Sequence, residues 1–469
     1  MFHLAAVIPA DRVHSMKNSP KVIDARLLTV ALFSALLVVL LVQHTSWLNG
    51  PTYWKWQWRQ LDALYSYPLL LLATLPFIAG HWLHLRGKLA IVTPLLLVMA
   101  TFFLLQLVAL GTQSDPFSLG RIAWIVEHPY MTSFYNDAQT FTGLREWLGN
   151  YPDRMSLFHL HSQNKPPGPI LYYVLMIKLF GGAASQVGGI LVGILATLAI
   201  PATYLLIRTI GGSQSGAFWG ASFLALCPGP VLFFPEFDQL YPLLTCAVIV
   251  LWVVALKRNH LGLASAFGVA LFMLTFFSFG LLVIGLFLAL LTLNFLLADP
   301  RRHIQRVAVQ AGMGLSVVVL GYVVLWLFTG FDPLATFSSA LQNQEHLAAV
   351  WQRPYPQTIV FDLTDFALGT GWISFLLAGL FLARHRSSPL QSHELRMAIC
   401  CLGQIVFIGV AGLIPTETAR VWIFLMPLLM FPVGEELVRW SSKTRAAVFG
   451  CMWLLLAAIH QNLVFISPT

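Results

Sequence analysis

Long apolar stretches separated by short polar ones make up almost the whole chain. A helix rises 1.5 Å per residue, so about 20 apolar residues cross a hydrocarbon core of roughly 30 Å. On that measure the pattern predicts an all-α, polytopic integral membrane protein with about 13 transmembrane helices. They are expected near residues 27–46, 62–83, 89–110, 184–207, 214–234, 240–256, 261–278, 280–298, 307–329, 358–383, 397–414, 420–437 and 445–463.

One long polar segment, residues 111–165, interrupts this pattern. The apolar stretch that follows it, 167–180, is too short to span a membrane and is expected to lie at the outer surface. Connections in compact folds usually have about 4–6 residues, so a loop of this length is expected to do work. We therefore divide the chain into an N-terminal three-span segment (1–110), a catalytic loop with juxtamembrane helices (111–183), and a scaffold of about ten spans (184–469).

The composition excludes a soluble protein, because 58% of the residues are hydrophobic and only 10% are charged, against about 25% charged in soluble domains. The net charge of +8 does not indicate nucleic acid. With a cytoplasmic N-terminus, 18 of the 27 basic residues fall inside and 13 of the 19 acidic residues outside, as the positive-inside rule requires. The long loop is then extracytoplasmic. Without a eukaryotic targeting signal, a bacterial inner membrane is the expected location.

The sequence predicts no cofactor. The five cysteines all lie in apolar stretches, without the spacing of a disulfide framework or a metal site. No metal ligands are assigned, and a divalent cation is left open.

The long loop is expected to carry short surface helices. Asp115-Pro-Phe-Ser resembles a cap that opens a helix ending near Glu127, where His128-Pro follows. Tyr135-Asn-Asp137 begins a second helix, expected to end near residue 148. The loop closes on His159-Leu-His161-Ser-Gln-Asn-Lys165 and a proline-rich entry into the helix 170–180.

These polar residues could support group transfer at a membrane surface. A carboxylate can act as general base on an acceptor hydroxyl, and a cation can neutralise a phosphate leaving group. The candidate bases are Asp115, Glu127 and Asp137, and the candidate phosphate partners are Lys165, Arg121, His159 and His161.

Each candidate also has a structural interpretation. Asp115 and Asp137 could simply cap helices, and Lys165 could sit at the headgroup boundary. His159 and His161 alternate, so in an extended segment at most one faces a site. The prolines after Lys165 restrict the backbone, which favours a functional role for that lysine.

Further acids are expected at the outer face. Glu236 and Asp238 flank an apolar residue at a span boundary, where acids are costly and suggest function. Asp362 and Asp365 share one helix face, whereas Glu417 and Arg420, at the same spacing, could serve only to pair with each other.

The segment 164–173, Asn-Lys-Pro-Pro-Gly-Pro-Ile-Leu-Tyr-Tyr, followed by Lys178-Leu-Phe-Gly181, resembles a motif of the GT-C superfamily. These membrane glycosyltransferases include the protein O-mannosyltransferases and the lipid A aminoarabinose transferases. Their Lys-Pro-Pro-Leu or His-Pro-Pro-Leu motif lies in the first large outer loop and leads into an aromatic surface helix. This chain departs twice: Gly168 stands where the family has leucine, and the loop follows the third predicted span.

The resemblance implies an outward-facing cavity that receives a polyprenyl-phosphate sugar. A loop acid would activate the acceptor hydroxyl, with inversion at the sugar carbon, and Lys165 would lie near the donor phosphate. The acid usually lies soon after the preceding span, which favours Asp115. Because the frequent Asp-Glu pair of the family is absent, the choice between Asp115 and Asp137 stays open.

We therefore predict a GT-C-like membrane glycosyltransferase. It would move a hexosyl or pentosyl group from a polyprenyl-phosphate donor to a lipid, glycan or protein acceptor on the extracytoplasmic side. Glu236 and Asp238 are expected to support the site. The alternatives are a transporter or flippase for a lipid-linked or anionic substrate, which would place charges in mid-span and break helices at membrane depth, and a non-enzymatic assembly factor, whose loop acids would be dispersed.

Overall fold

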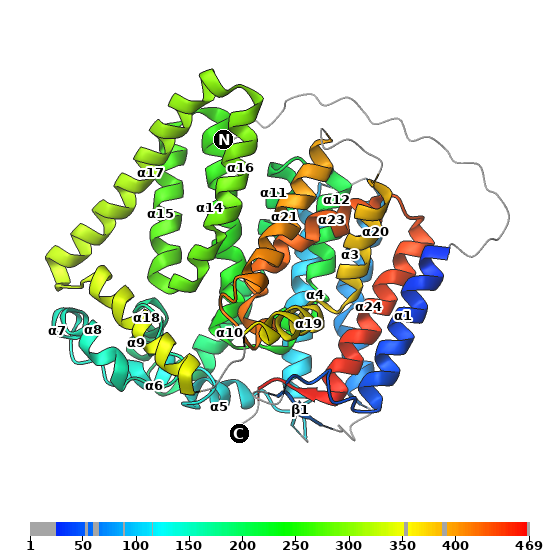
Figure 1. Cartoon of the computed structure of the whole chain (residues 1–469). Coiled ribbons are helices and arrows are strands. Elements are labelled where there is room, and N and C mark those ends of the chain that lie inside the picture. Colours follow the sequence, from blue (N-terminus) through cyan, green and yellow to red (C-terminus); the bar gives the residue numbers. More distant parts are fainter. Residues whose placement is uncertain are drawn as a thin grey trace.

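The computed structural model describes residues 25–51, 55–59, 65–87, 90–114, 116–350, 355–386 and 392–466. These residues are almost entirely helical, as predicted (Figure 1). The exception is a pair of two-residue antiparallel strands, β1 (Gln57–Trp58) and β2 (Leu463–Val464), which joins a segment in the first part of the chain to the last residues described.

The long apolar stretches form helices that could cross a membrane, and the chain is an integral membrane protein. Nine candidate spans occur within the described ranges. They are α1 (Ala25–Val42); α2 (Ser66–Ala73) with α3 (Leu75–Arg86); α4 (Val92–Gly111); α9 (Gly168–Phe180), η2 (Gly181–Ala183), α10 (Ala184–Ala196) and α11 (Ala199–Thr209) together; η3 (Phe237–Leu240) with α14 (Tyr241–Arg258); η4 (Phe279–Ile284) with α16 (Gly285–Ala298); α17 (Pro300–Thr329); α21 (His393–Val410); and α24 (Ser442–Asn462).

The expected count of 13 is not reached by these helices, for three physical reasons. The stretch 358–383 is bent by 102° between α19 (Gln357–Thr370) and α20 (Ile373–Arg384), and would make a tenth span if the pair counts as one. Helix α15 (Leu261–Phe277) is apolar but has only 17 residues. The stretches 214–234 and 420–437 are divided into shorter pieces: α12 (Gln214–Leu224), α13 (Pro228–Leu232), α22 (Thr418–Val421), η5 (Ile423–Leu425) and α23 (Met426–Val438).

Two of these short helices, α12 and α23, form the centre of the molecule. Almost every residue of both is buried. Their backbones approach closely at glycines: a Cβ on Gly434 would collide with the Gly216 carbonyl oxygen, and one on Gly220 would lie 2.5 Å from the Met430 carbonyl oxygen. Small residues that allow such an approach are typical of helix interfaces in membrane proteins.

The long polar loop gathers at one end of the molecule (Figure 1). It forms α5 (Arg121–Glu127), α6 (Phe134–Ala138), α7 (Leu144–Gly149), α8 (Tyr151–Arg154) and η1 (Met155–Leu157). The first predicted helix ends at Glu127 as expected, but it begins at Arg121 after Gly120 and not at the expected cap near Asp115. The second predicted helix is divided into α6 and α7. Trp147 and Tyr151 are fully buried, so the loop has its own packed core.

Helix α9 packs against α6 at this end and is followed by η2 and α10. Together with α11 they form a 42-residue candidate span, about twice the length that one crossing needs. The surface position expected for 170–180 stays a prediction. Helix α18 (Pro333–Val350) also lies at the loop end (Figure 1) and packs against α8 and η1.

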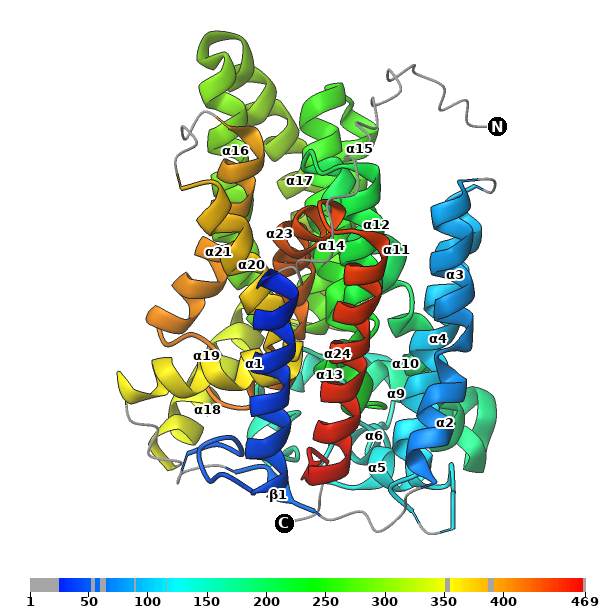
Figure 2. The same cartoon turned by 90° about the vertical axis from the view of Figure 1, so that its right-hand side faces the viewer.

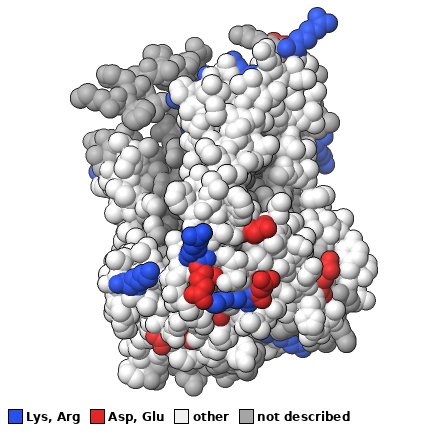
Figure 3. All heavy atoms as spheres, turned by 90° about the vertical axis from the view of Figure 1, so that its left-hand side faces the viewer, with Lys and Arg blue, Asp and Glu red and all other residues white. Residues whose placement is uncertain are grey.

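Only 10% of the residues are charged. Figure 3 shows acidic and basic groups gathered in the lower part of one face, beneath a broad surface that carries almost no charge. Figure 2 shows α1 and α24 side by side, with their ends near β1 at the loop end of the molecule. The basic ends of α3, α14 and α20 lie at the opposite end (Figures 1 and 2).

The close approach of α12 and α23 predicts a stability effect. Gly434→Ala would force its new methyl group against the Gly216 carbonyl, and overpacking of this kind costs about 1–3 kcal/mol. We expect a lower thermal unfolding temperature in detergent. Gly379→Ala on α20 is the matched control, because open space surrounds that glycine. Equal unfolding temperatures for the two variants would contradict the described packing.

Candidate active site

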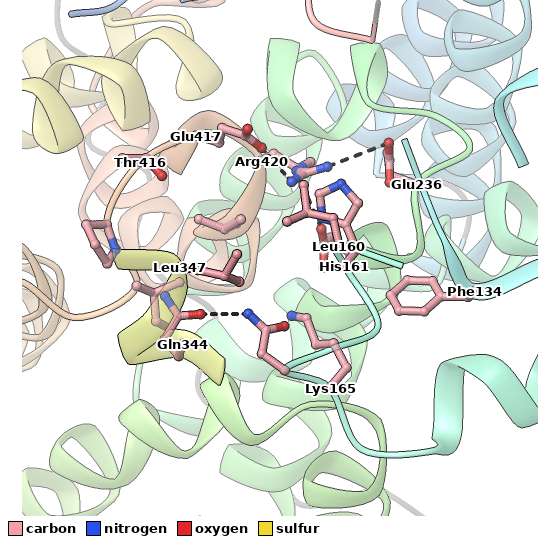
Figure 4. Close-up of a pocket in the computed structure, with 15 residues that line it drawn as sticks. Phe134, Leu160, His161, Lys165, Glu236, Gln344, Leu347, Thr416, Glu417 and Arg420 are labelled. Carbon is pink, nitrogen blue, oxygen red and sulfur yellow. Dashed lines mark hydrogen bonds and ion pairs between the residues drawn. The ribbon is translucent and has the colours of Figure 1, made fainter. Parts of the chain in front are cut away.

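A cavity of about 140 Å³ lies at the loop end, where four segments distant in sequence meet (Figure 4). The segments are the end of the long loop, the turn before η3, helix α18 and the turn between α21 and α22. The lining residues are Phe134, Leu160, His161, Asn164, Lys165, Glu236, Asp238, Gln344, Leu347, Ile414, Pro415, Thr416, Glu417, Arg420 and Val421.

The end of the long loop, which carries Lys165, is held in place by contacts that other residues make with its backbone. The Tyr151 hydroxyl donates a hydrogen bond to the Lys165 carbonyl oxygen at 2.9 Å. Immediately after the two prolines, a Cβ on Gly168 would lie 2.5 Å from the Phe276 carbonyl oxygen at the end of α15. The chain therefore needs glycine here, which gives a physical reason for the departure from the leucine of the GT-C motif.

The Lys165 side chain reaches into the cavity without an acidic partner. Its Nζ donates to the Ser278 hydroxyl at 3.4 Å and lies 5.3 Å from the centre of the Tyr241 ring. Burial lowers the pKa of Lys165, and the charge of Asp238 partly offsets that effect. Within the described ranges, no carboxylate lies within 4.0 Å of this ammonium group.

Arg420 holds three carboxylates at the other end of the cavity (Figure 4). Its Nη2 lies 2.5 Å from Glu417 Oε2, its Nη1 3.7 Å from Glu236 Oε1, and its Nε 3.7 Å from Asp238 Oδ2. Burial alone would lower the pKa of Arg420, but the three carboxylates outweigh it and raise that pKa. Burial raises the pKa of Glu236 to about 8, although Arg420 opposes the shift.

The turn that presents Glu417 and Arg420 has an unusual backbone. Ile414, Thr416 and Glu417 all have positive φ angles, of 52°, 71° and 51°. This region is uncommon for residues other than glycine, and a β-branched residue there is strained. Strain of this kind persists only when the surrounding structure fixes it, and it is frequent at functional sites.

Helix α19, which precedes the 102° bend to α20, provides that support. Asp362 Oδ1 accepts a hydrogen bond from the Thr416 backbone N–H at 2.8 Å. Asp365 Oδ2 accepts one from the Ala419 N–H at 2.7 Å, while its Oδ1 accepts one from Trp56 Nε1 at 2.7 Å. These two acids, expected from their spacing to share a helix face, thus position the turn that carries the ion cluster.

His161 lines the middle of the cavity in its neutral form. Burial, and then the charge of Arg420, lowers its pKa to about 4. Its Nε2 lies 3.1 Å from the Tyr130 carbonyl oxygen, so this nitrogen carries the proton. Next to it, Asn164 donates to Gln344 Oε1 at 2.6 Å, which fastens α18 to the loop (Figure 4).

The cavity therefore collects four of the residues proposed from the sequence: Lys165, His161, Glu236 and Asp238. The other candidates that the structure describes are not among its lining residues. Asp115 lies outside the described residues. Arg121 donates to the Ile466 carbonyl oxygen at 3.0 Å and lies over the Trp124 ring.

Asp137 and His159 form a separate pair beside the cavity. The buried Asp137 carboxylate accepts from the His159 backbone N–H at 3.2 Å and lies 2.7 Å from His159 Nδ1. It therefore holds the loop at His159, ahead of the motif that begins at Asn164, in addition to any role as a base. The His159 ring is 44% exposed, so its outer edge faces away from the protein core.

Sequence reasoning missed the central place of Arg420 and the part played by Ser278. Glu417 and Arg420 do pair with each other, as their spacing suggested, but Arg420 also reaches acids more than 180 residues earlier. The available signal was a short polar turn, Thr416 to Arg420, between two apolar stretches. No comparable signal distinguished Ser278.

The described residues contain no group of three or more His, Cys, Asp and Glu side chains placed to hold a metal ion. The candidate acids of the cavity instead face an arginine. The expectation that the protein has no cofactor stays a prediction.

Comparison with known proteins supports the fold. No protein-family model and no curated protein sequence matches the chain. Among solved structures, it is similar to the Archaeoglobus fulgidus oligosaccharyltransferase tethered to an acceptor peptide containing the NVT sequon, with a TM-score of 0.50 and 12% identity. The match covers 78% of this chain and 55% of that chain, so this chain spans little more than half of its length. At that identity the likeness concerns the fold, and it agrees with the GT-C-like fold predicted from the sequence.

The ion cluster predicts a coupled loss of stability. Arg420→Gln would leave two buried acids without their cation, and removing one partner of a buried pair costs about 3–5 kcal/mol. Adding Glu236→Gln removes one of those acids and should restore part of the thermal stability. Arg154→Gln, which breaks an exposed pair with Glu146, should change little. If the double variant unfolds no later than Arg420→Gln alone, Glu236 is not coupled to Arg420.

Proposed function

We propose that the protein is a membrane glycosyltransferase that uses a polyprenyl-phosphate sugar. One observation supports this most: a partly buried lysine without an acidic partner among the described residues and a cluster of acids line the same cavity at the loop end. The shared fold with an oligosaccharyltransferase and the Lys-Pro-Pro motif agree with it. The acceptor would be a lipid, glycan or protein with a reactive hydroxyl group.

Lys165 is proposed to bind the donor phosphate. A phosphate would supply the negative charge that this lysine lacks within the described structure, and a charge-assisted hydrogen bond is strongest where water is scarce. Pro166 and Pro167 fix the backbone directly after it, so the ammonium group is held in place. In the transfer step, this cation would stabilise the negative charge that develops on the leaving phosphate.

The reaction would proceed by a single displacement. The acceptor oxygen forms a bond to the anomeric carbon as the bond from that carbon to the phosphate oxygen breaks. The electron pair of the broken bond stays on the polyprenyl phosphate, and the acceptor proton moves to a carboxylate. Attack from the face opposite the phosphate inverts the anomeric carbon.

Glu236 is the acid of the cavity best suited to take that proton. Its pKa of about 8 lies near neutrality, where a general base works most efficiently. Asp238 and Glu417 would then balance the charge of Arg420. The roles proposed from the sequence for Asp115 and Asp137 remain open, and the variants below distinguish the three acids.

An apolar groove close to Lys165 offers a place for the carrier lipid. It has a volume of about 720 Å³ and lies between α17, the start of η4 and the first turn of α18. Phe279, which lines it, directly follows the Ser278 that contacts Lys165. The phosphate could thus bind the lysine while the chain lies along the groove, because the cavity itself is too small for both.

The alternatives receive less support. A transporter would place charged groups in mid-span and break helices at membrane depth. The chain does bend by 102° between α19 and α20, but the acids of α19 bind backbone N–H groups of a turn at the loop end. An assembly factor would disperse the acids, whereas three of them share Arg420. We therefore propose a bacterial inner-membrane enzyme with a cytoplasmic N-terminus and an extracytoplasmic active site.

The lysine assignment predicts a selective loss of transfer. In proteoliposomes that contain a polyprenyl-phosphate sugar and an acceptor, Lys165→Ala should lower kcat/KM by about 100-fold or more, the scale for removing one charge-stabilising group. Lys178→Ala, an exposed lysine on α9 that is absent from the cavity lining, should retain activity. Equal activity of the wild type and the two variants would exclude Lys165 as the phosphate partner.

The base assignment predicts a pH profile. A base must be ionised to accept a proton, so kcat/KM should rise with pH and level off above about 8, the pKa of Glu236. Glu236→Gln should remove this limb and most of the activity. Asp115→Asn and Asp137→Asn should keep it. A limb that persists in Glu236→Gln and disappears in one of the other two variants would assign the base to that residue.

A further inference from the structure

A second cavity lies far from the loop, between α3, α12 and α24, which Figure 2 shows around one side of the molecule. Its volume is about 430 Å³. The walls are mostly apolar and include Leu71, Phe77, Ile78, Phe449 and Trp453. Leu71 and Ile78 are more than half exposed, so the groove opens sideways, toward the surrounding bilayer.

One buried cation, Arg445, lies at the end of this groove where α24 begins. Arg445 is only 8% exposed, and its guanidinium stacks 4.0 Å from the centre of the Trp219 ring. Its Nη1 donates to the Leu437 carbonyl oxygen at 2.9 Å. No ion pair of Arg445 occurs among the described residues, and a buried charge without an opposite charge is costly.

A second polar group in the groove also has no partner. His81 Nδ1 lies 2.9 Å from the Phe77 carbonyl oxygen, so this nitrogen carries the proton and Nε2 is an acceptor. His81 Nε2 is buried and has no hydrogen-bond partner in the described structure. The ring is stacked on Trp219, the same indole that carries Arg445, at a centroid distance of 5.1 Å. A ligand with both an anionic group and a hydroxyl group would satisfy the arginine and the histidine together.

The groove has the length of one leaflet. Its lining on α24 runs from Ser442 to Trp453, a rise of about 17 Å at 1.5 Å per residue. Half of the hydrocarbon core is about 15 Å thick. The cation is near the end that the charge distribution places in the cytoplasm, and the apolar walls continue toward the middle of the membrane.

We infer that this groove binds an anionic phospholipid of the inner leaflet. The phosphate would pair with Arg445, a headgroup hydroxyl would donate to His81 Nε2, and an acyl chain would lie along Phe449 and Trp453. Basic pockets between membrane helices on the cytoplasmic side are known to bind anionic headgroups. The site is separate from the proposed donor site and does not depend on the proposed reaction.

Two variants of the full chain test the inference. Arg445→Gln removes the charge. Gly450→Phe fills the groove, since open space surrounds the Gly450 α-carbon and no clash is expected. The matched controls are Arg439→Gln, an exposed arginine at the same end, and Gly403→Phe, an exposed helical glycine on α21 that also has open space around it. The second variant keeps the test valid if Arg445→Gln fails to fold.

The measurement is lipid binding by native mass spectrometry, in micelles with equal phosphatidylglycerol and phosphatidylcholine. The wild type and both controls should retain phosphatidylglycerol in preference to phosphatidylcholine. Arg445→Gln should lower this retention about tenfold, the ratio for one charge-assisted hydrogen bond of ordinary strength, and Gly450→Phe should abolish it. Glycerol 3-phosphate should not displace the lipid, because it lacks the acyl chains. Equal binding of both lipids by the wild type, or undiminished binding by Gly450→Phe, would overturn the inference.

Discussion

The contact of Arg420 with three carboxylates is the interaction on which the candidate site depends. Two of these acids are buried, and buried acids without a cation would repel one another and resist ionisation. Arg420 therefore joins the turn before η3 to the turn before α22. The second turn keeps its strained backbone because Asp362 and Asp365 bind its N–H groups. The acids of α19 thus position the turn that carries Arg420, and Arg420 holds the acids that face the cavity.

The sequence predicted the parts of this arrangement that depend on local pattern. Apolar length located most membrane helices, and the Lys-Pro-Pro segment, with its glycine and aromatic helix, indicated the loop that lines the cavity. The span count could not be predicted in the same way. In 214–234 the Pro228-Gly-Pro segment begins a separate short helix, and in 420–437 the short elements α22 and η5 precede α23, although both stretches look continuous by composition.

Contacts between distant segments were the part that pattern could not provide. Lys165 meets Ser278 across 113 positions, and Arg420 meets Glu236 across a still longer separation. Nothing in the spacing of either residue specifies its partner. The same holds for Asp137. Its position suggested a helix cap or a base, but the structure pairs it with His159. The two ends of the molecule thus offer different chemistry: charged groups in a small cavity at the loop end, and a lone arginine over an apolar groove at the other.

The central claim is that Lys165 and the acids around Arg420 act on one lipid-linked phosphate sugar. The most direct measurement is an experimental structure of the full chain in a lipid nanodisc with a non-hydrolysable polyprenyl-phosphate sugar analogue. We expect the phosphate within hydrogen-bond distance of Lys165 Nζ, the sugar facing Glu236, and the lipid chain in the groove that Phe279 lines. A phosphate bound elsewhere, with Lys165 still on Ser278 and Tyr241, would contradict it.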